Sequence, residues 1–188
     1  HRVDRRQRQM CIRDRVMTSP KVKNTIVEGS NKVNGAQTYH CHAFNCQIGL
    51  AVQQKLAKEN IIEKGAAVGE YMMEQLALRL KDSKIVGDIR GLPLFFSLEF
   101  CDPKTKEPFE PAFAMAYKLA DKCLENGITT MGFQGTAGTV EGPDGLVGSG
   151  DHLSVAPAYT ITMEEGEIVI EALVKSIFEI EKLYFETH

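Results

Sequence analysis

A threonine stands directly ahead of a predicted helix, at a position where a phosphate group could bind. Thr38 is followed by a segment with apolar residues at every fourth position, namely Phe44, Ile48, Val52 and Leu56. This spacing predicts a helix. A hydroxyl and the free backbone N–H groups of a helix N-terminus together suit a phosphate. Thr38 is therefore a candidate phosphate-binding residue, and a simple turn or N-cap residue is the alternative.

Side chains that commonly bind zinc gather at the same point of the sequence: His40, Cys41, His42 and Cys46. The two histidines flank Cys41 too closely for a tetrahedral zinc finger, and no second ligand pair follows at finger spacing. The five cysteines of the chain include no Cys-x-x-Cys pair. We therefore expect no metal and reduced thiols, with a His/Cys metal module kept as an alternative.

An arginine in residues 84–101 could bind a carboxylate. Arg90 lies two residues after Asp88, so the two share one face of a strand. The planar guanidinium matches a substrate carboxylate, which makes Arg90 a candidate substrate-binding residue. A structural ion pair that pins neighbouring strands uses the same geometry, and we favour that interpretation.

The elements that would position these residues follow from the apolar spacing. Residues 84–101 predict two strands joined at Arg90 and Gly91, the second with Leu94, Phe96, Leu98 and Phe100 on one face and Ser97 and Glu99 on the other. Helices are predicted over residues 21–27, 44–56, 61–81, 111–126 and from 162 onward. Helices laid on one apolar sheet face make a small α/β domain.

Several details of this prediction can be tested. The helix from Pro111 should turn an inner stripe to the core, made of Phe113, Ala116, Ala120 and Leu124. A short strand is predicted at 128–131 and a last strand within 151–159. The glycine-rich residues 132–150 between them predict a mobile loop. A phosphate-binding loop is the weaker alternative, because no Gly-Lys-Ser/Thr ends the segment.

Charge and length narrow the functional classes. The first fifteen residues carry a charge of +4 and the whole chain −3, so residues 16–188 carry −7. An acidic body argues against nucleic-acid binding. No apolar run has the length of a membrane helix and no secretory signal pattern opens the chain, so we expect a cytoplasmic protein with no membrane partner. Residues 1–15 are interpreted as a non-native tail, similar to translated sequencing-adapter DNA.

The order of several motifs resembles the C-terminal part of class III pyridoxal-phosphate (PLP) aminotransferases. They are the Thr38–Tyr39 pair ahead of a helix, the sequence VGDIRG before an apolar strand that ends in LEF, and the segment DHLSVAPAY. The resemblance implies fold type I, with residues 16–69 as the end of the large PLP-binding domain and residues 70–188 as the small α/β domain. It also implies a homodimer in which Thr38 contacts the PLP phosphate.

The resemblance further implies a transaminase that moves an amino group from an amine, ω-amino or amino acid donor to a keto acid. The Schiff-base lysine is expected upstream of this chain; Lys21, Lys23 and Lys32 do not match its surroundings and are interpreted as surface residues. The fragment alone is therefore expected to be inactive. Many family members carry an arginine for the substrate α-carboxylate where this chain has Ser154, which favours an amine or ω-amino donor.

Two other functional classes remain open at this stage. Fold does not fix the reaction, so a mutase or decarboxylase is compatible with the same architecture. The chain could also be a non-catalytic domain or pseudoenzyme that mediates protein interaction. PLP-binding residues upstream of Val16 would discriminate between an enzyme and such a domain.

Overall fold

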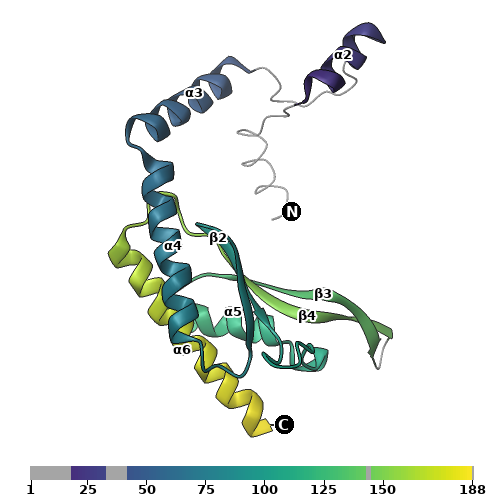
Figure 1. Cartoon of the computed structure of the whole chain (residues 1–188), viewed down its shortest axis with the longest axis vertical. Coiled ribbons are helices and arrows are strands. Elements are labelled where there is room, and N and C mark those ends of the chain that lie inside the picture. Colours follow the sequence, from purple (N-terminus) through teal and green to yellow (C-terminus); the bar gives the residue numbers. More distant parts are fainter. Residues whose placement is uncertain (1–17, 33–41, 143–144, 188) are drawn as a thin grey trace. The chain divides into compact units, whose positions relative to one another are not determined.

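The computed structural model describes residues 18–32, 42–142 and 145–187 of the chain (Figure 1). The chain divides into two compact units, residues 1–59 and residues 60–188. The predicted domain boundary at residues 69 and 70 falls within a continuous helix and stays a prediction. Among the described residues, no helix is long and apolar enough to cross a membrane.

The first unit contains the two predicted helices. They are α2 (Pro20–Glu28) and α3 (Ala43–Lys58). The side-chain oxygen of Ser19 accepts a hydrogen bond from the backbone N–H of Val22, and Pro20 occupies the first turn, where a missing N–H costs nothing. Neither helix contains a buried residue.

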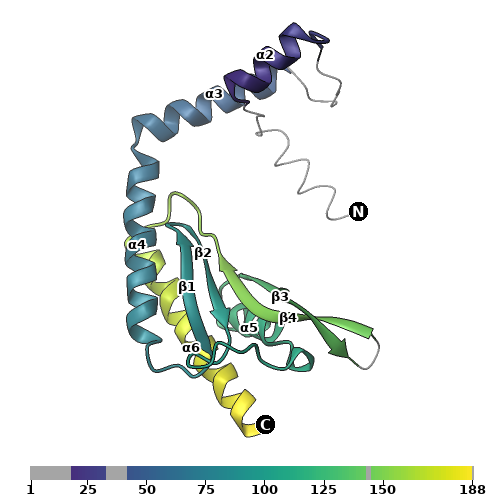
Figure 2. The same cartoon turned by 45° about the vertical axis from the view of Figure 1, so that its right-hand side comes forward.

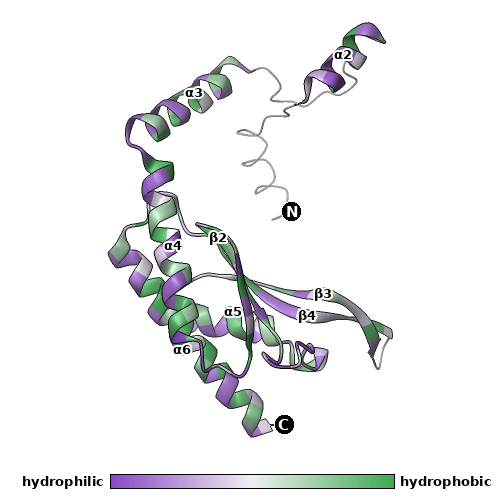
Figure 3. Ribbon diagram, viewed as in Figure 1, coloured by the Kyte–Doolittle hydropathy of each residue, from purple (hydrophilic) through white to green (hydrophobic). Residues whose placement is uncertain are grey.

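The second unit is a four-stranded antiparallel sheet with helices on one face (Figure 2). Its spatial strand order is β1-β2-β4-β3. The elements in chain order are α4 (Ile61–Arg79), β1 (Val86–Leu92), β2 (Phe95–Phe100), the short 3-10 helix η1 (Pro111–Phe113), α5 (Met115–Glu125), β3 (Met131–Gly142), β4 (Gly145–Val155) and α6 (Met163–Thr187). The core lies between the sheet and the inner sides of α4, α5 and α6, and Figure 3 shows the mixed hydropathy of these helices.

The predicted alternation of the second strand is confirmed. Phe96, Leu98 and Phe100 are buried in the core, and Ser97 and Glu99 point away from it. The predicted position of the turn is wrong, because Leu92 pairs with Phe95 and the turn lies at residues 93–94.

Gly91 is required for close strand packing rather than for a turn. It lies within β1 at φ 145°, and a Cβ there would come within 2.5 Å of the carbonyl oxygen of Phe95. The glycine therefore allows the two strands to approach closely, whereas Leu94 adopts the left-handed turn conformation at φ 63°.

The glycine-rich segment is a β-ribbon, so both the predicted mobile loop and the short strand at 128–131 are wrong. β3 and β4 pair along almost their whole length, with a register shift between Gln134 and Gly138. A Cβ on Gly148 would lie 2.9 Å from the Cα of Gly135, so these glycines let the two backbones come together. Backbone pairing needs no side chains, and a composition rich in glycine therefore does not exclude a strand pair.

The helix predicted from Pro111 is interrupted. Ala114 adopts a left-handed conformation at φ 55°, which separates η1 from α5. Most of the predicted inner stripe is nevertheless confirmed: Phe113 and Ala116 are buried and Ala120 packs partly buried against the core, whereas Leu124 is 63% exposed. Met115, Leu119 and Cys123 are buried as well. The predicted end at Asn126 is confirmed, because it is the C-cap of α5.

Helix α6 closes the core as predicted. Its start is a capping box: the hydroxyl oxygen of Thr162 accepts the backbone N–H of Glu165 at 3.2 Å, and the Glu165 carboxylate accepts the N–H of Thr162 at 2.9 Å. Leu173, Ile177 and Ile180 lie fully or almost fully buried against the sheet and the other helices.

Candidate functional site

The open face of the sheet, opposite the helices, carries a group of polar and aromatic side chains that could take part in binding or chemistry. Cross-strand pairing aligns them in two rows. One row runs Arg90, Ser97, Ser154 and Met131, and the other runs Asp88, Glu99, His152 and Phe133. The alternation of side chains along each strand produces this arrangement, because the intervening residues face the core.

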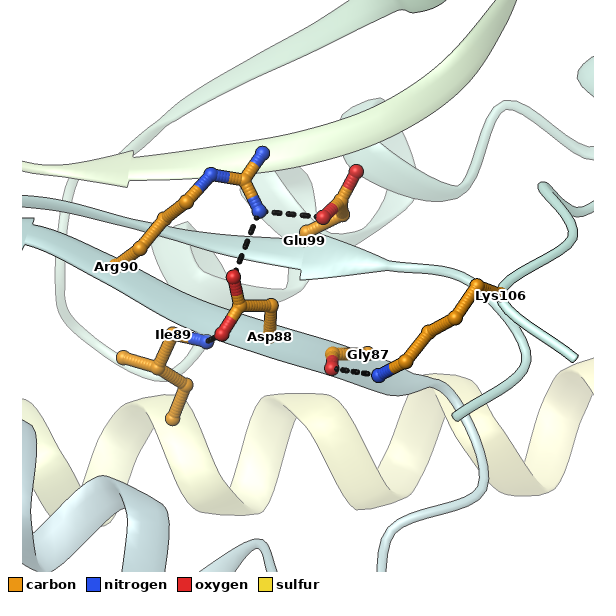
Figure 4. Close-up of polar contacts among 6 residues, drawn as sticks. All are labelled: Gly87, Asp88, Ile89, Arg90, Glu99 and Lys106. Atoms are coloured by element: carbon orange, nitrogen blue, oxygen red, sulfur yellow. Dashed lines mark hydrogen bonds and ion pairs between the residues drawn. The ribbon is translucent and has the colours of Figure 1, made fainter. Parts of the chain in front are cut away.

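Arg90 lies between two carboxylates at one side of this face (Figure 4). Its guanidinium nitrogen Nη1 donates to Asp88 Oδ2 at 3.0 Å and to a carboxylate oxygen of Glu99. The hydrogen bond to Glu99, followed by that to Asp88, raises the pKa of Arg90 above its ordinary value. The arrangement agrees with the ion-pair interpretation that the sequence favoured, and substrate binding by Arg90 stays a prediction.

Two serine hydroxyls meet at the centre of the open face. Ser97 Oγ and Ser154 Oγ lie 3.1 Å apart, on β2 and β4, and either can donate the hydrogen bond. A hollow of about 470 Å³ lies next to this pair. The hollow is lined by Arg90, Gly91, Leu92, Phe95, Ser97, Thr136 and His152.

His152 is one of the two aromatic residues that line this hollow, together with Phe95. Its ring stacks on Phe133, with ring centroids 4.9 Å apart and an angle of 10° between the planes. Its Nδ1 atom is buried and has no hydrogen-bond partner among the described residues. Among the described residues that line the hollow, Arg90 alone carries a full positive charge, and two carboxylates already balance it. The face is therefore suited to neutral polar and aromatic groups rather than to a free carboxylate.

One buried acid on the opposite face escaped the sequence analysis. Asp151 is fully buried, and its Oδ1 atom accepts the backbone N–H of Ala116 in the first turn of α5 at 2.9 Å. Burial raises the pKa of Asp151, although the hydrogen bond from Ala116 acts against this shift. The only signal in the sequence was an acidic residue at an inward position of a predicted strand.

The remaining residues singled out from the sequence lie in the first unit. Thr38, His40 and Cys41 fall outside the described residues, so the phosphate-binding role of Thr38 stays a prediction. His42 and Cys46 are exposed, and the described part of the chain contains no group of three or more metal-binding side chains. Lys21, Lys23 and Lys32 are exposed, as predicted for surface lysines.

The architecture is that of known transaminases. An (S)-enantioselective omega-transaminase from Thermomicrobium roseum superposes with a TM-score of 0.68 at 25% identity, over 87% of this chain and 33% of that enzyme. A transaminase obtained by ancestral reconstruction superposes with a TM-score of 0.70 at 27% identity, over 88% of this chain and 34% of that protein. The fold is therefore that of the C-terminal part of a fold-type I transferase, as the sequence predicted.

Comparison of the sequences identifies the family to which the chain belongs. The family model for class III aminotransferases matches residues 12–177, and the chain belongs to this family. It is 35% identical over 159 residues to an uncharacterized aminotransferase of Schizosaccharomyces pombe, which covers 84% of this chain and 33% of that protein. It is 29% identical over 172 residues to a vanillin aminotransferase of Capsicum frutescens, which covers 89% of this chain and 34% of the relative. The chain thus spans about a third of the length of these relatives.

Proposed function

We propose that this chain is the C-terminal part of a PLP-dependent transaminase that moves an amino group from a donor to a keto acid. The observation that carries the proposal is the match to class III aminotransferases, which extends over residues 12–177. The agreement of the fold with transaminase structures, over 87–88% of this chain, supports it. The homodimer and the cytoplasmic location inferred from the sequence are part of the same proposal.

The described residues do not by themselves make a complete PLP site. PLP, when bound, supplies an electron sink for charge that develops on the substrate, and it is held through a lysine in a secluded pocket. None of the described lysines is buried. We therefore assign no step of the reaction to the described residues. Thr38 is the residue we propose for the PLP phosphate.

We propose an amine or ω-amino donor in preference to an α-amino acid. The support comes from Ser154, which stands where many family members carry an arginine for the α-carboxylate. Its hydroxyl lies 3.1 Å from that of Ser97 and is neutral, so it cannot balance a carboxylate charge. The neighbouring cation, Arg90, is already paired with Asp88 and Glu99.

The first experiment measures whether the 188-residue chain is active. The purified chain is mixed with PLP, an amine donor and a keto acid. We expect neither the visible absorbance of a PLP–lysine Schiff base nor transfer of the amino group. Transamination by this polypeptide would contradict the proposal that the fragment is inactive, and would identify one of its own lysines as the reactive one.

The second experiment tests the donor class in a longer protein that includes the upstream region. The variant Ser154→Arg should raise kcat/KM for α-amino acid donors relative to amines, because it restores a cation on the open face. Ser30→Arg, at an exposed position of the first unit, adds the same charge and should leave the ratio unchanged. If the ratio of kcat/KM for α-amino acids to that for amines is unchanged in both variants, the role of Ser154 is refuted. If the unmodified longer protein shows no transamination at all, the proposed reaction itself is refuted.

A further inference from the structure

Strand β1 lies at one edge of the sheet, and the structure leaves space beside it. Among the described strands, β1 pairs with β2 alone. A hollow of about 830 Å³ lies along the other side, lined among others by residues 86–89 of β1, Lys81 of the segment after α4 and Phe185 of α6. An edge strand with open space beside it is a template for pairing with another strand.

Two backbone groups on the open edge of β1 are hydrogen-bonded to side chains instead of to another strand (Figure 4). The carbonyl oxygen of Gly87 accepts a hydrogen bond from Lys106 Nζ at 2.7 Å. The backbone N–H of Ile89 donates to Asp88 Oδ1 at 2.8 Å. An incoming strand would have to displace both contacts before it could extend the sheet.

Hydrogen bonds to Asp102 fix the loop that carries Lys106. Asp102 Oδ1 accepts the backbone N–H groups of Lys104 at 2.7 Å and Thr105 at 2.9 Å, and the Asp102 carbonyl accepts the N–H of Lys106 at 2.8 Å. Lys106 itself lies at φ 64°, a conformation that disfavours residues other than glycine. These loop contacts fix the backbone from which the Lys106 side chain extends to Gly87.

The backbone of β1 adds a further obstacle to strand addition. The register with β2 shifts between Val86 and Asp88, so Gly87 forms an irregularity in the strand. A Cβ on Gly87 would lie 2.1 Å from Cys101 Sγ, so a larger residue here would force the Cys101 side chain to move. Irregularities of this kind, together with lysines, are devices by which natural sheets protect their edges.

We propose that Lys106 and Asp88 form an edge guard, which prevents β1 from pairing with β1 of a second copy of this chain. Lys106 donates a hydrogen bond to the carbonyl oxygen of Gly87, and Asp88 accepts one from the N–H of Ile89, so neither backbone group is free to pair with another strand. Asp88 is held in place in turn by Arg90, which donates to its other carboxylate oxygen. The network of Arg90, Asp88 and Glu99 therefore has a consequence at the sheet edge as well as on the open face.

The test compares three variants of the 188-residue chain. Lys106→Met keeps the apolar stem and loses the donor, and Lys106→Arg keeps a donor. Lys104→Met makes the same change of charge in the same loop, at an exposed residue whose side chain does not contact Gly87 among the described contacts. Each variant is examined by light scattering after size exclusion and by amide hydrogen exchange of β1.

We expect Lys106→Met to shift to a higher mass than the parent chain, with slower amide exchange in β1, while Lys106→Arg and Lys104→Met behave like the parent. Equal masses and equal β1 exchange in all four proteins would overturn the proposal. So would an increase of mass in Lys106→Met that leaves β1 exchange unchanged, because association would then use another surface.

A further variant separates association from loss of folding. Lys106→Gly removes the side chain and also relieves the strained φ of 64°, so the loop keeps its conformation at lower cost. Circular dichroism should show a folded protein. If this folded variant remains at the mass of the parent chain, the edge guard is refuted even where Lys106→Met fails to fold.

Discussion

Two consecutive helices, α3 and α4, differ in what surrounds them. Both have apolar residues at helical spacing, and Figure 3 shows the same mixture of hydrophobic and hydrophilic residues along each. Six residues of α4 are buried, whereas none of α3 is, and Phe44 of α3 is 66% exposed. The sequence pattern of the two helices is thus similar, and their burial is not.

The difference in burial between α3 and α4 comes from the elements that pack against α4. Helix α4 packs against α6, and its glycines Gly65 and Gly69 accommodate the turn of the β1–β2 hairpin. A Cβ on Gly65 would lie 2.6 Å from Leu94 Cδ1. An apolar stripe therefore predicts that a helix forms, but burial depends on whether another element of the same chain covers the stripe.

The largest expected effect contrasts two leucines. Leu76 of α4 is fully buried and Leu50 of α3 is 51% exposed. Leu76→Ala removes buried methyl groups and leaves a cavity, so it should lower the free energy of unfolding by about 2–5 kcal/mol. Leu50→Ala should change it by less than about 0.5 kcal/mol. Urea unfolding of both variants measures the difference, and similar losses would show that α3 is covered in the same way as α4.

An intermediate effect contrasts two glycines. A Cβ on Gly69 would lie 2.5 Å from the backbone nitrogen of Leu94, so Gly69→Ala should destabilise the second unit by about 1–3 kcal/mol. A Cβ on Gly49 would have no described atom within 4 Å beyond its chain neighbours and its own helix backbone. Gly49→Ala should therefore stabilise α3 by roughly 0.5–1 kcal/mol through its helix propensity. Thermal melting followed by far-ultraviolet circular dichroism checks both, and the same sign for both would contradict the proposed packing of α4.

The smallest effect concerns two ion pairs and their dependence on pH. Arg79 of α4 donates to Glu167 of α6, and this hydrogen bond lowers the pKa of Glu167 below its ordinary value of 4.5. The folded state therefore gains stability above pH 4.5 and loses it as the pH falls through the lowered pKa.

In Arg79→Met, the free energy of unfolding should fall much less steeply than in the parent protein as the pH is lowered below about 5. Urea unfolding at a series of pH values (roughly 3 to 6) measures this change. The control is Lys55→Met, which breaks the exposed pair of Lys55 and Glu59 within α3. Exposed pairs of this kind contribute little, so the control should follow the parent protein at every pH. A pH profile of Arg79→Met that matches the parent would show that the pair does not couple α4 to α6.

The regular parts of the fold could be predicted from the sequence because local patterns determine them. The stripe of α6, the capping box at Thr162 and the alternation of Phe96, Leu98 and Phe100 each depend on residues close in sequence. The ribbon of β3 and β4 could not be predicted in this way. Its glycines fit a loop equally well, and only the pairing of the two backbones distinguishes the two structures.

The candidate site was predictable only in part. The spacing of Asp88 and Arg90 predicted that they share a face, which is confirmed by their ion pair. The partners Glu99 and Ser97 lie on the next strand, and their positions depend on the register that the turn at residues 93–94 sets. A turn three residues earlier, as predicted, would give a different register and would not place Glu99 beside Arg90.

The hydrogen bond between Tyr71 of α4 and Glu167 of α6 joins residues that are 96 apart in the sequence. A ribosome adds about 5–20 residues per second, so roughly 5–20 s separate the synthesis of these two helices. During that interval the apolar stripe of α4 lacks the helix that covers it. The nascent chain must therefore keep this stripe from other hydrophobic surfaces until α6 has been made.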